Sequence, residues 1–275
     1  MIHFFCALPC EAKPLINHFK LKVDQTSDLF KIYITDDKRI TLTICGIGKL
    51  NAASAAAYHC AHINPAKSDI WLNIGIAGHQ DAELGHAYLA NKITDSITQD
   101  TWYPQFIFKS PCKSLSLITL ESPSNDYQAS LFDMEASGFY SVASRIGTNE
   151  LIHCFKVISD NATNDFKHLN AKQVARYIEQ QIDTIESIIN ILQPYSNELI
   201  QISTPPDPFN KLVNQIHFTA TEKIQLERLL IQWKVRLPEI KPDNVINLDM
   251  KAKAVLKTLA NQLEASPLNF PMMRK

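Results

Sequence analysis

Carboxylate side chains follow several apolar runs of the sequence, at positions where they can serve a reaction. Glu11 comes after the run 2–8, Asp133 and Glu135 follow a pair of apolar residues, and Asp160 ends the run that begins at 151. Taken singly, each has an ordinary explanation, because acidic residues favour the first turn of a helix and often start turns. Three carboxylates in one pocket suit cleavage of a glycosidic bond: one activates water, a protonated one supplies a proton to the leaving group, and a third binds sugar hydroxyls.

Glycine is scarce in this chain and concentrated in one region. Of the seven glycines in 275 residues, five lie within residues 46–85, namely Gly46, Gly48, Gly75, Gly78 and Gly85. Such a chain keeps glycine where the backbone needs a positive φ or where a ligand approaches the main chain closely. The run Cys45-Gly-Ile-Gly-Lys49 precedes a predicted helix, so its amides can hold an anion or a ribose oxygen. It lacks the third glycine of a dinucleotide fingerprint and the form of a P-loop, so it does not by itself indicate a nucleotide site.

The segments that must position these residues alternate between short apolar runs and helical patterns. Strands are predicted at 2–8, 69–75, 87–97, 115–120 and 151–158, with a hairpin of 29–35 and 39–45, and helices at 11–19, 49–63, 134–146 and 171–193. The last helix has Asn170 as its predicted N-cap and Pro194 as its stop. This alternation indicates an α/β domain whose sheet is covered on both faces. Strands of one sheet bring their carboxyl ends to a common crevice, so we expect the carboxylates to meet there.

Composition bounds the class of protein. Apolar residues make up 45% and charged residues 20%, which is typical of a soluble folded chain, and the formal net charge of −1 gives no reason to expect nucleic acid as a partner. No stretch approaches the twenty apolar residues of a membrane span. The six cysteines are scattered without a CxxC pair or zinc-knuckle spacing, and several lie inside apolar runs, which predicts a reduced, cytoplasmic protein. His59 and His62 flank Cys60, but a third ligand at metal spacing is lacking, so these residues are predicted to bind no metal.

The C-terminal part reads as a separate helical appendage. Residues 1–199 carry 16 basic and 21 acidic residues, whereas residues 200–275 carry 11 and 7, and the proline-rich run 203–208 between them reads as a semi-rigid linker. Beyond the linker, Thr219 and Glu222 form a capping-box pattern ahead of an apolar stripe, and a second stripe contains Leu248, Ala252, Val255, Leu256, Leu259 and Leu263. We therefore predict two domains, 1–199 and 200–275.

At the positions discussed above, the sequence resembles the nucleoside phosphorylase and nucleosidase superfamily, and most closely its methylthioadenosine/S-adenosylhomocysteine nucleosidases. The likeness covers approximately residues 2–195 and rests on five motifs in family order: Ala7-x-x-x-Glu11, Gly46-Ile-Gly-Lys-Leu-Asn-Ala52, Asn73-x-Gly-x-Ala-Gly78 followed by Leu84-Gly85, Asp133-Met-Glu-Ala136, and Ile158-Ser-Asp-Asn-Ala162. The resemblance implies a three-layer α/β/α domain with a central mixed, partly barrel-like sheet, and a purine nucleosidase that uses no metal or organic cofactor.

The resemblance also implies roles for individual residues. Glu11 would be the base that activates water, Glu135 would bind the ribose hydroxyls beside Met134, and Asp160 would protonate or hydrogen-bond purine N7 with help from Ser159. The sugar and base would be lined by Ile47, Ala77 and Gly78, and by Ile76, which stands where nucleosidases commonly have serine. In such nucleosidases a partner subunit closes the pocket over the 5′ substituent. The corresponding stretch here contains Trp102, Tyr103, Pro104 and Phe106, so the resemblance implies a homodimer.

The attacking nucleophile can be argued from charge. A phosphorylase must hold a phosphate dianion with several cationic side chains, yet the first domain has only Arg39, Arg145 and Arg176, and none lies in the glycine-bearing loops. Glu11 would repel phosphate, which favours water as the nucleophile. Lys13 and Lys49 keep a phosphate-dependent purine nucleoside phosphorylase open as an alternative.

Two further questions stay open at this point. The segment 120–126 is shorter than the one that normally stacks an aromatic ring on the base, and position 45 is cysteine where serine is usual. The base can therefore be adenine, which the run Ser159-Asp160-Asn161 favours, or another or modified purine, such as that of futalosine or of a hopanoid precursor. A third function is a non-catalytic nucleoside sensor or scaffold that binds through the same carboxylates and engages a partner through its C-terminal helices.

Overall fold

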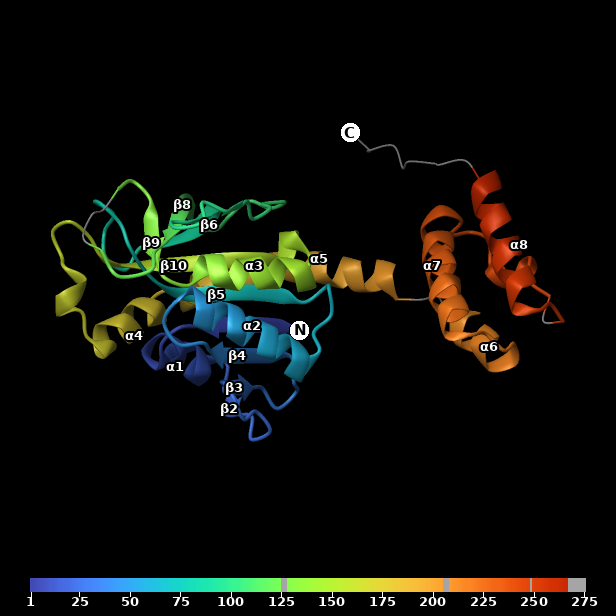
Figure 1. Ribbon diagram of the computed structural model, residues 1–275, viewed down its shortest axis with the longest axis horizontal. Coiled ribbons are helices and arrows are strands. Elements are labelled where there is room, and N and C mark those ends of the chain that lie inside the picture. The colour runs from blue at the N-terminus through green and yellow to red at the C-terminus, as the bar shows by residue number, and fades with distance from the viewer. Residues whose placement is uncertain (125–127, 205–207, 248, 267–275) are drawn as a thin grey trace. The chain divides into compact units, whose positions relative to one another are not determined.

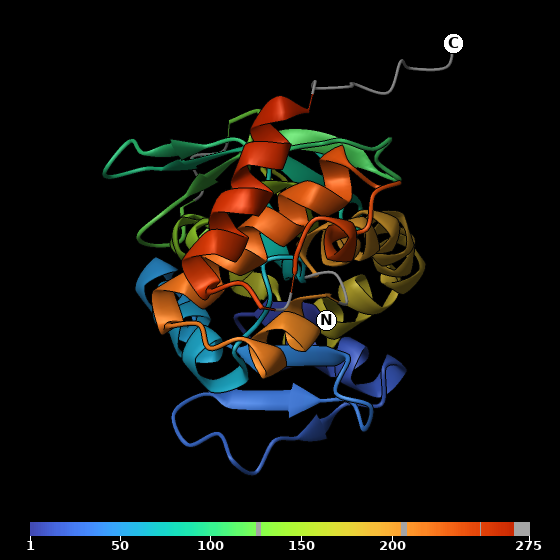
Figure 2. The same cartoon turned by 90° about the vertical axis from the view of Figure 1, so that its right-hand side faces the viewer.

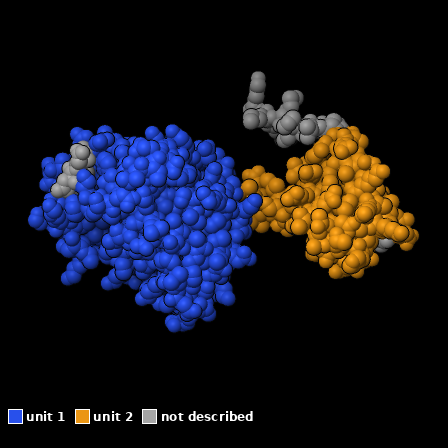
Figure 3. Space-filling view, in the orientation of Figure 1, with its two compact units in different colours: residues 1–196 blue, residues 197–275 orange. Residues whose placement is uncertain are grey.

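The computed structural model describes residues 1–124, 128–204, 208–247 and 249–266 (Figure 1). The chain packs as two compact units, Met1–Ser196 and Asn197–Lys275 (Figure 3). Leu248 of the second predicted stripe, residues 205–207 of the predicted linker and residues 125–126 of the shortened segment lie outside the described residues.

Unit 1 is built on one mixed sheet. Its parallel centre has the order β10 (Ile152–Asp160), β5 (Ile70–Gly78), β1 (Ile2–Cys6) and β4 (Ile40–Ile44). Antiparallel strands β3 (Lys31–Ile34) and β2 (Lys22–Val23) extend it on the β4 side. These central strands are almost continuously buried, as expected for parallel strands with helices on both faces.

The other side of the sheet closes on itself. β10 pairs with β6 (Ala87–Asp95), β6 with β8 (Lys113–Thr119), and β8 with β9 (Leu131–Asp133). β9 then returns to β5 through the pair Gly78 and Phe132, and the short β7 (Thr101–Trp102) adds to β6. The ring β5, β10, β6, β8 and β9 is the predicted barrel-like part of the sheet.

Helices cover the sheet from two sides. α2 (Lys49–Ile63) and α3 (Ala136–Ile146) pack against each other on one face, and α1 (Pro9–His18) packs with α4 (Ala171–Glu179) on the other (Figures 1 and 2). Between α3 and the sheet, the ring of Phe5 stacks on Trp71 at 5.3 Å and contacts Phe139 at 5.1 Å between ring centroids. The predicted three-layer α/β/α class is confirmed, and helix 49–63 has the predicted bounds.

The predicted single helix 171–193 is wrong in two respects. α4 starts at its predicted N-cap Asn170, whose side chain accepts from the amides of Lys172 and Gln173, but it ends at Glu179. Gln181 lies in the break, where its side chain donates to Gly85 O at 2.8 Å, and α5 (Ile182–Ser203) then continues through Pro194. Proline removes one helical hydrogen bond. Buried residues on the same helix offset that cost here, and Ser196 near the proline is anchored as well, because its Oγ donates to Ser68 O at 2.6 Å.

Unit 2 contains the helices α6 (Pro208–Gln215), α7 (Ala220–Arg236) and α8 (Ala252–Ala265) around a core of their own. The predicted capping box is present at the start of α7: Thr219 Oγ1 accepts from the Glu222 amide at 3.3 Å, and Glu222 accepts from the Thr219 amide at 2.9 Å. Trp233 is buried in the core and donates to Ile240 O at 2.6 Å. Among the described helices of both units, none has the length and hydrophobicity needed to cross a membrane.

Candidate active site

A pocket of about 450 Å³ opens at the carboxyl ends of β1, β5 and β10. Nine of the predicted site residues line it: Glu11, Ile47, Ile76, Ala77, Gly78, Met134, Glu135, Ser159 and Asp160. Its remaining walls come from the start of α1, from β9 and its neighbour 120–124, and from the start of α4. Carboxylates from distant parts of the sequence therefore share one cavity.

Glu11 is held rigidly at the floor of this pocket. It lies in the first turn of α1, which Pro9 begins, and only 3% of it is exposed. Its Oε2 accepts from the Leu8 amide at 2.8 Å and its Oε1 from the Ile76 amide at 2.9 Å. A side chain at position 75 would place Cβ 2.8 Å from Oε1, so glycine is required there for the close approach. Burial raises the pKa of Glu11, against the opposing effect of the two amides and of Lys156, which makes the carboxylate a stronger base.

Glu135 connects the glycine loop 46–48 to the neighbouring carboxylate of Asp133. It precedes α3, and its Oε1 accepts from the amide of Gly48 at 2.8 Å. Gly48 has φ of +100°, a conformation that favours glycine and that aims this amide at the carboxylate. Burial, followed by repulsion from Asp133, raises the pKa of Glu135 to about 7. The group therefore titrates near neutral pH.

The structure adds a buried ion pair that sequence reasoning missed. Lys156 lies on β10, is 1% exposed, and its Nζ is 2.8 Å from Asp133 Oδ2. Asp133 also accepts from Thr119 Oγ1 and from the Ala136 amide, both at 2.8 Å, so it caps α3 as well as pairing with the lysine. Burial alone would lower the pKa of Lys156, but Asp133 and then Glu135 raise it, so the lysine stays charged. The available signal was a lysine inside the run 151–158, which is otherwise apolar except for His153.

The pocket and its surroundings therefore combine one buried cation with several acidic groups. Glu11, Asp133, Glu135 and Asp160 are each less than 10% exposed, whereas Lys156 is the one lysine or arginine buried to this extent in the described part of the chain. A position 75 side chain would also lie 3.5 Å from Lys156 Nζ, so the lysine and Glu11 face the same glycine. An excess of carboxylates in a site of low dielectric favours a substrate that becomes positively charged in its transition state.

Asp160 and Ser159 end β10 at the rim of the pocket. Ser159 Oγ donates to Asp160 Oδ1 and lies 3.4 Å from Ala77 O. The backbone of Asp160 is fixed as well, since its carbonyl accepts from the His79 amide at 3.1 Å. Next along the chain, Asn161 donates to Ala82 O at 2.9 Å and accepts from the amides of Thr163 and Asn164. The loop that follows the strand is thus organised around Asn161, and Asp160 remains part of the pocket wall.

Two predicted site residues do not line this pocket. Trp102 lies on β7 and packs beside the core between α3 and the sheet. The ring of Phe106 contacts Phe108 at 5.6 Å and the buried His153 at 5.4 Å between centroids. Both were expected to reach the pocket of a partner subunit, so their absence from the pocket of their own chain leaves that prediction untested.

His59, one of the two histidines near Cys60, belongs to a buried polar network rather than to the pocket. His59 Nδ1 lies 2.9 Å from Thr43 Oγ1, and its Nε2 lies 3.0 Å from His3 Nδ1. His3 in turn bonds Asp69 at 3.2 Å. Within the described ranges, no group of three or more His, Cys, Asp or Glu side chains is arranged to hold a metal ion.

Comparison with known proteins identifies the fold. No protein-family model matches the sequence, and no curated protein matches it. Solved structures do match, and they are nucleosidases of the superfamily that the sequence motifs resemble. The chain has the nucleoside phosphorylase/nucleosidase fold, and the predicted resemblance is confirmed at that level.

Three of these structures illustrate the match. The apo 5′-methylthioadenosine nucleosidase of Arabidopsis thaliana has a TM-score of 0.55 and 20% identity, covering 70% of this chain and 95% of that one. The Neisseria meningitidis 5′-methylthioadenosine/S-adenosylhomocysteine nucleosidase in complex with methylthio-immucillin-A has a TM-score of 0.55 and 14% identity, covering 68% and 98%. The futalosine hydrolase of Helicobacter pylori has a TM-score of 0.54 and 11% identity, covering 69% and 97%.

Proposed function

We propose that this protein is a purine nucleosidase that hydrolyses the N-glycosidic bond of a 5′-substituted purine nucleoside of the methylthioadenosine or S-adenosylhomocysteine type. The observation that carries the proposal is the convergence of Glu11, Glu135 and Asp160 in one pocket of about 450 Å³. That volume lies within the range of small-molecule sites, and the solved structures with the same fold include hydrolases of this class.

In the proposed reaction Glu11 is the general base. It takes a proton from a water molecule as the water oxygen forms a bond to C1′ of the ribose and the bond from C1′ to purine N9 breaks. The hydrogen bond from Asp160 to N7 becomes a full proton transfer as the bond from C1′ to N9 breaks, so the electron pair stays on a purine that leaves as the neutral base. Afterwards Glu11 releases the proton that it took from water, and Asp160 regains one from solvent. Ionised Glu135 accepts hydrogen bonds from the ribose hydroxyls. The products are the free purine and the 5′-substituted ribose.

Hydrolysis is favoured over phosphorolysis by the charges around the pocket. Among the described residues that line it, none is lysine or arginine. The nearby cations are engaged: Lys156 pairs with Asp133, and Lys49 pairs with Asp95 and Glu121. Lys13, the other lysine that kept phosphorolysis open, is exposed on α1. A phosphate dianion placed beside Glu11 would therefore meet uncompensated negative charge.

The proposal extends to assembly. Exposed apolar side chains on the segments that begin α2 and follow β7 support a homodimer, since Ile47, Leu50 and Tyr103 are 51%, 78% and 60% exposed. Light scattering at assay concentration tests this, and a monomer would remove the dimer from the proposal. The cytoplasmic location stays a prediction from the cysteine pattern.

Product analysis tests the function directly. Purified protein is incubated with methylthioadenosine, S-adenosylhomocysteine, adenosine, inosine and futalosine, each with and without phosphate. Free base without phosphate supports the nucleosidase, and the ranking of substrates identifies the base and the 5′ group. Base released only with phosphate would replace the proposal by a phosphorylase, and tight binding without turnover would replace it by a nucleoside sensor.

A further inference from the structure

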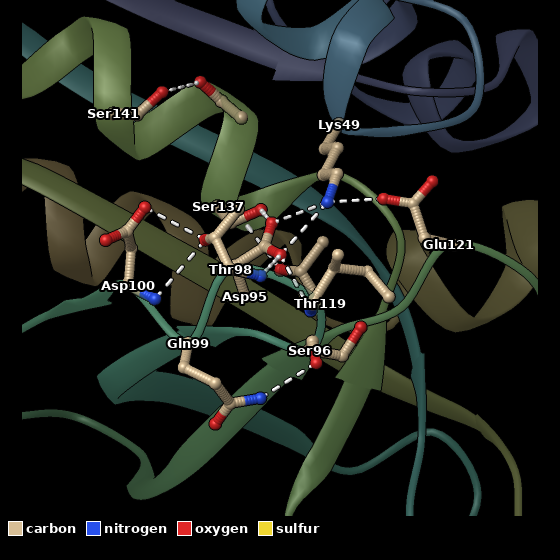
Figure 4. Close-up of polar contacts among 12 residues, drawn as sticks. Lys49, Asp95, Ser96, Thr98, Gln99, Asp100, Thr119, Glu121, Ser137 and Ser141 are labelled. Atoms are coloured by element: carbon tan, nitrogen blue, oxygen red, sulfur yellow. Dashed lines mark hydrogen bonds and ion pairs between the residues drawn. The ribbon is translucent and has the colours of Figure 1, made fainter.

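A second polar cluster lies beside the pocket, centred on Lys49 at the start of α2 (Figure 4). Lys49 Nζ donates to both carboxylate oxygens of Asp95, at 3.0 and 2.9 Å. The same ammonium group forms an ion pair with Glu121. Two carboxylates from different segments, the end of β6 and the chain after β8, are thereby bridged by one cation.

Asp95 is a fixed anchor for this bridge. Its side chain is 6% exposed, and it accepts from Ser137 Oγ at 2.9 Å and from the amides of Ile97 and Thr98 at 2.9 and 3.0 Å. Burial alone would raise the pKa of Asp95, but the hydrogen bonds from Lys49 and from these groups lower it. Asp95 therefore remains charged and holds Lys49 in one position.

The backbone of Lys49 is fixed by α3. A Cβ at Gly138 would lie 1.9 Å from Lys49 O, so the two helices touch at main-chain distance. Immediately before Lys49, the Gly48 amide donates to Glu135 at 2.8 Å. Any displacement of Lys49 thus moves the donor that orients the predicted ribose-binding carboxylate.

Glu121 belongs to a segment that forms part of the pocket wall. Leu120, Pro123 and Ser124 line the pocket, and Leu120 donates its amide to Asp133 O at 2.7 Å. A chain of hydrogen bonds also returns to the pocket from Asp95: Ser137 binds Asp95, and its amide donates to Thr119 Oγ1 at 3.0 Å. Thr119 in turn donates to Asp133 at 2.8 Å. Both series of contacts end at Asp133, the residue that pairs with Lys156.

We propose that Lys49 is a positioning residue which, by pairing with Asp95 and Glu121 together, locks the glycine loop 46–48 and the wall segment 120–124 in the geometry that binds the nucleoside. The identity of the bound nucleoside rests on the proposed function. The coupling between the glycine loop 46–48 and the wall segment 120–124 does not, because it exists in the protein without ligand. Glu121 is 55% exposed, so its pair with Lys49 is open to screening by salt.

The test compares Glu121→Gln with the control Asp36→Asn. Asp36 forms an exposed ion pair with Lys22 at 2.8 Å on the hairpin side of the sheet, away from the pocket-lining residues. We expect Glu121→Gln to raise KM about three- to fivefold with kcat within about twofold, since exposed pairs contribute little more than this. Raising the salt concentration should move the wild-type KM towards that of Glu121→Gln and leave the variant unchanged. Asp36→Asn should match wild type in both respects.

Lysine substitutions give an independent readout. Lys49→Arg keeps the charge and should retain KM within about twofold, whereas Lys49→Met leaves buried Asp95 without its cation and should raise KM further than Glu121→Gln. If Lys49→Met does not fold, Glu121→Gln and Lys49→Arg decide the question. An unchanged KM in Glu121→Gln, or a rise that Asp36→Asn shares, would overturn the proposal.

Hydrogen exchange separates this inference from the proposed function. In the protein without ligand, Glu121→Gln should speed amide exchange about three- to fivefold in both 46–52 and 119–124, and Asp36→Asn should not. If wild type hydrolyses no nucleoside but this exchange result is obtained, the nucleosidase proposal fails and the coupling of the walls stands. If the exchange rate in Glu121→Gln changes in neither segment, or only in 119–124, the coupling of the two segments is rejected, whatever the enzymatic activity.

Discussion

Replacing Gly138 by alanine tests the packing that positions the glycine loop. Gly138 lies within α3, where alanine is normally the better residue by about 1 kcal/mol. Its Cβ, however, would lie 1.9, 2.6 and 2.8 Å from the O, C and Cα atoms of Lys49. These are main-chain atoms at the start of α2, so no flexible side chain can move aside and the two helices must separate.

The magnitude follows from two opposing contributions. Overpacking a well-packed interior costs about 1 to 3 kcal/mol, and a contact this short with backbone belongs at the upper end of that range. Subtracting the helix-propensity gain of about 1 kcal/mol leaves a net loss of about 2 kcal/mol. For a unit of this size that loss lowers Tm by about 4 to 8 °C. Because Lys49 adjoins Gly48, the displacement also moves the amide that binds Glu135, so KM should rise.

Calorimetry and steady-state kinetics on the same preparations provide the assay. Ser144→Ala, on the same helix, is the control, because it raises helix propensity by a smaller amount and adds no atom, so it should change stability by less than about 0.5 kcal/mol. A Gly138→Ala protein with a Tm equal to or above that of wild type would refute the reasoning, since propensity would then outweigh the contact.

Three other predictions concern protonation. The pKa of Glu135 is raised to about 7 by burial and by Asp133, and the ionised form binds ribose, so kcat/KM should fall as the pH drops below about 7. Glu135→Gln should abolish this inflection, and a wild-type profile flat from about pH 6 to 8 contradicts the role. Asp160→Asn should lose about 10²- to 10⁴-fold in turnover with an unchanged Tm, and unaltered turnover would remove the acid assignment. Burial, followed by the neighbouring histidines, holds the pKa of His59 well below its usual 6.5, so the unfolded state binds more protons. Stability should therefore be full above about pH 6.5 and decline as the pH falls towards the depressed value. The decline should be shallower in His59→Gln, and an equal decline in both proteins would exclude His59 as its source.

Local patterns predicted much of the fold because they act through neighbours in the sequence. The capping residues Asn170 and Thr219 begin helices as predicted, and helix 49–63 follows its glycine loop without a shift in either boundary. The convergence of Glu11 and Asp160 was predictable as well, because Glu11 follows β1 and Asp160 ends β10, and strand ends in a parallel sheet share one edge. Glu135 follows β9, which pairs antiparallel with β5, so its position in the pocket depends on how the ring of strands closes.

Features that depend on tertiary packing were not predictable in the same way. The pairing of Lys156 with Asp133 joins residues of two strands that are not adjacent in the sheet, and no spacing rule connects them. The close contact of Gly138 with Lys49 follows no local pattern either, because the two residues are 89 positions apart in the chain. Pro194 looked like a helix stop, because the buried neighbours that carry α5 past it come from folding of the whole unit.

The closed ring of strands described above also bears on aggregation. Closing β5, β10, β6, β8 and β9 leaves only the two-residue β7 as an edge among the described strands on that side, and the path through the other strands ends at β2. β2 has only two residues, Lys22 and Val23, and both are exposed. A short terminal strand that carries a lysine is a poor template for strand addition by another chain. Intermolecular extension of the sheet through this edge is therefore disfavoured.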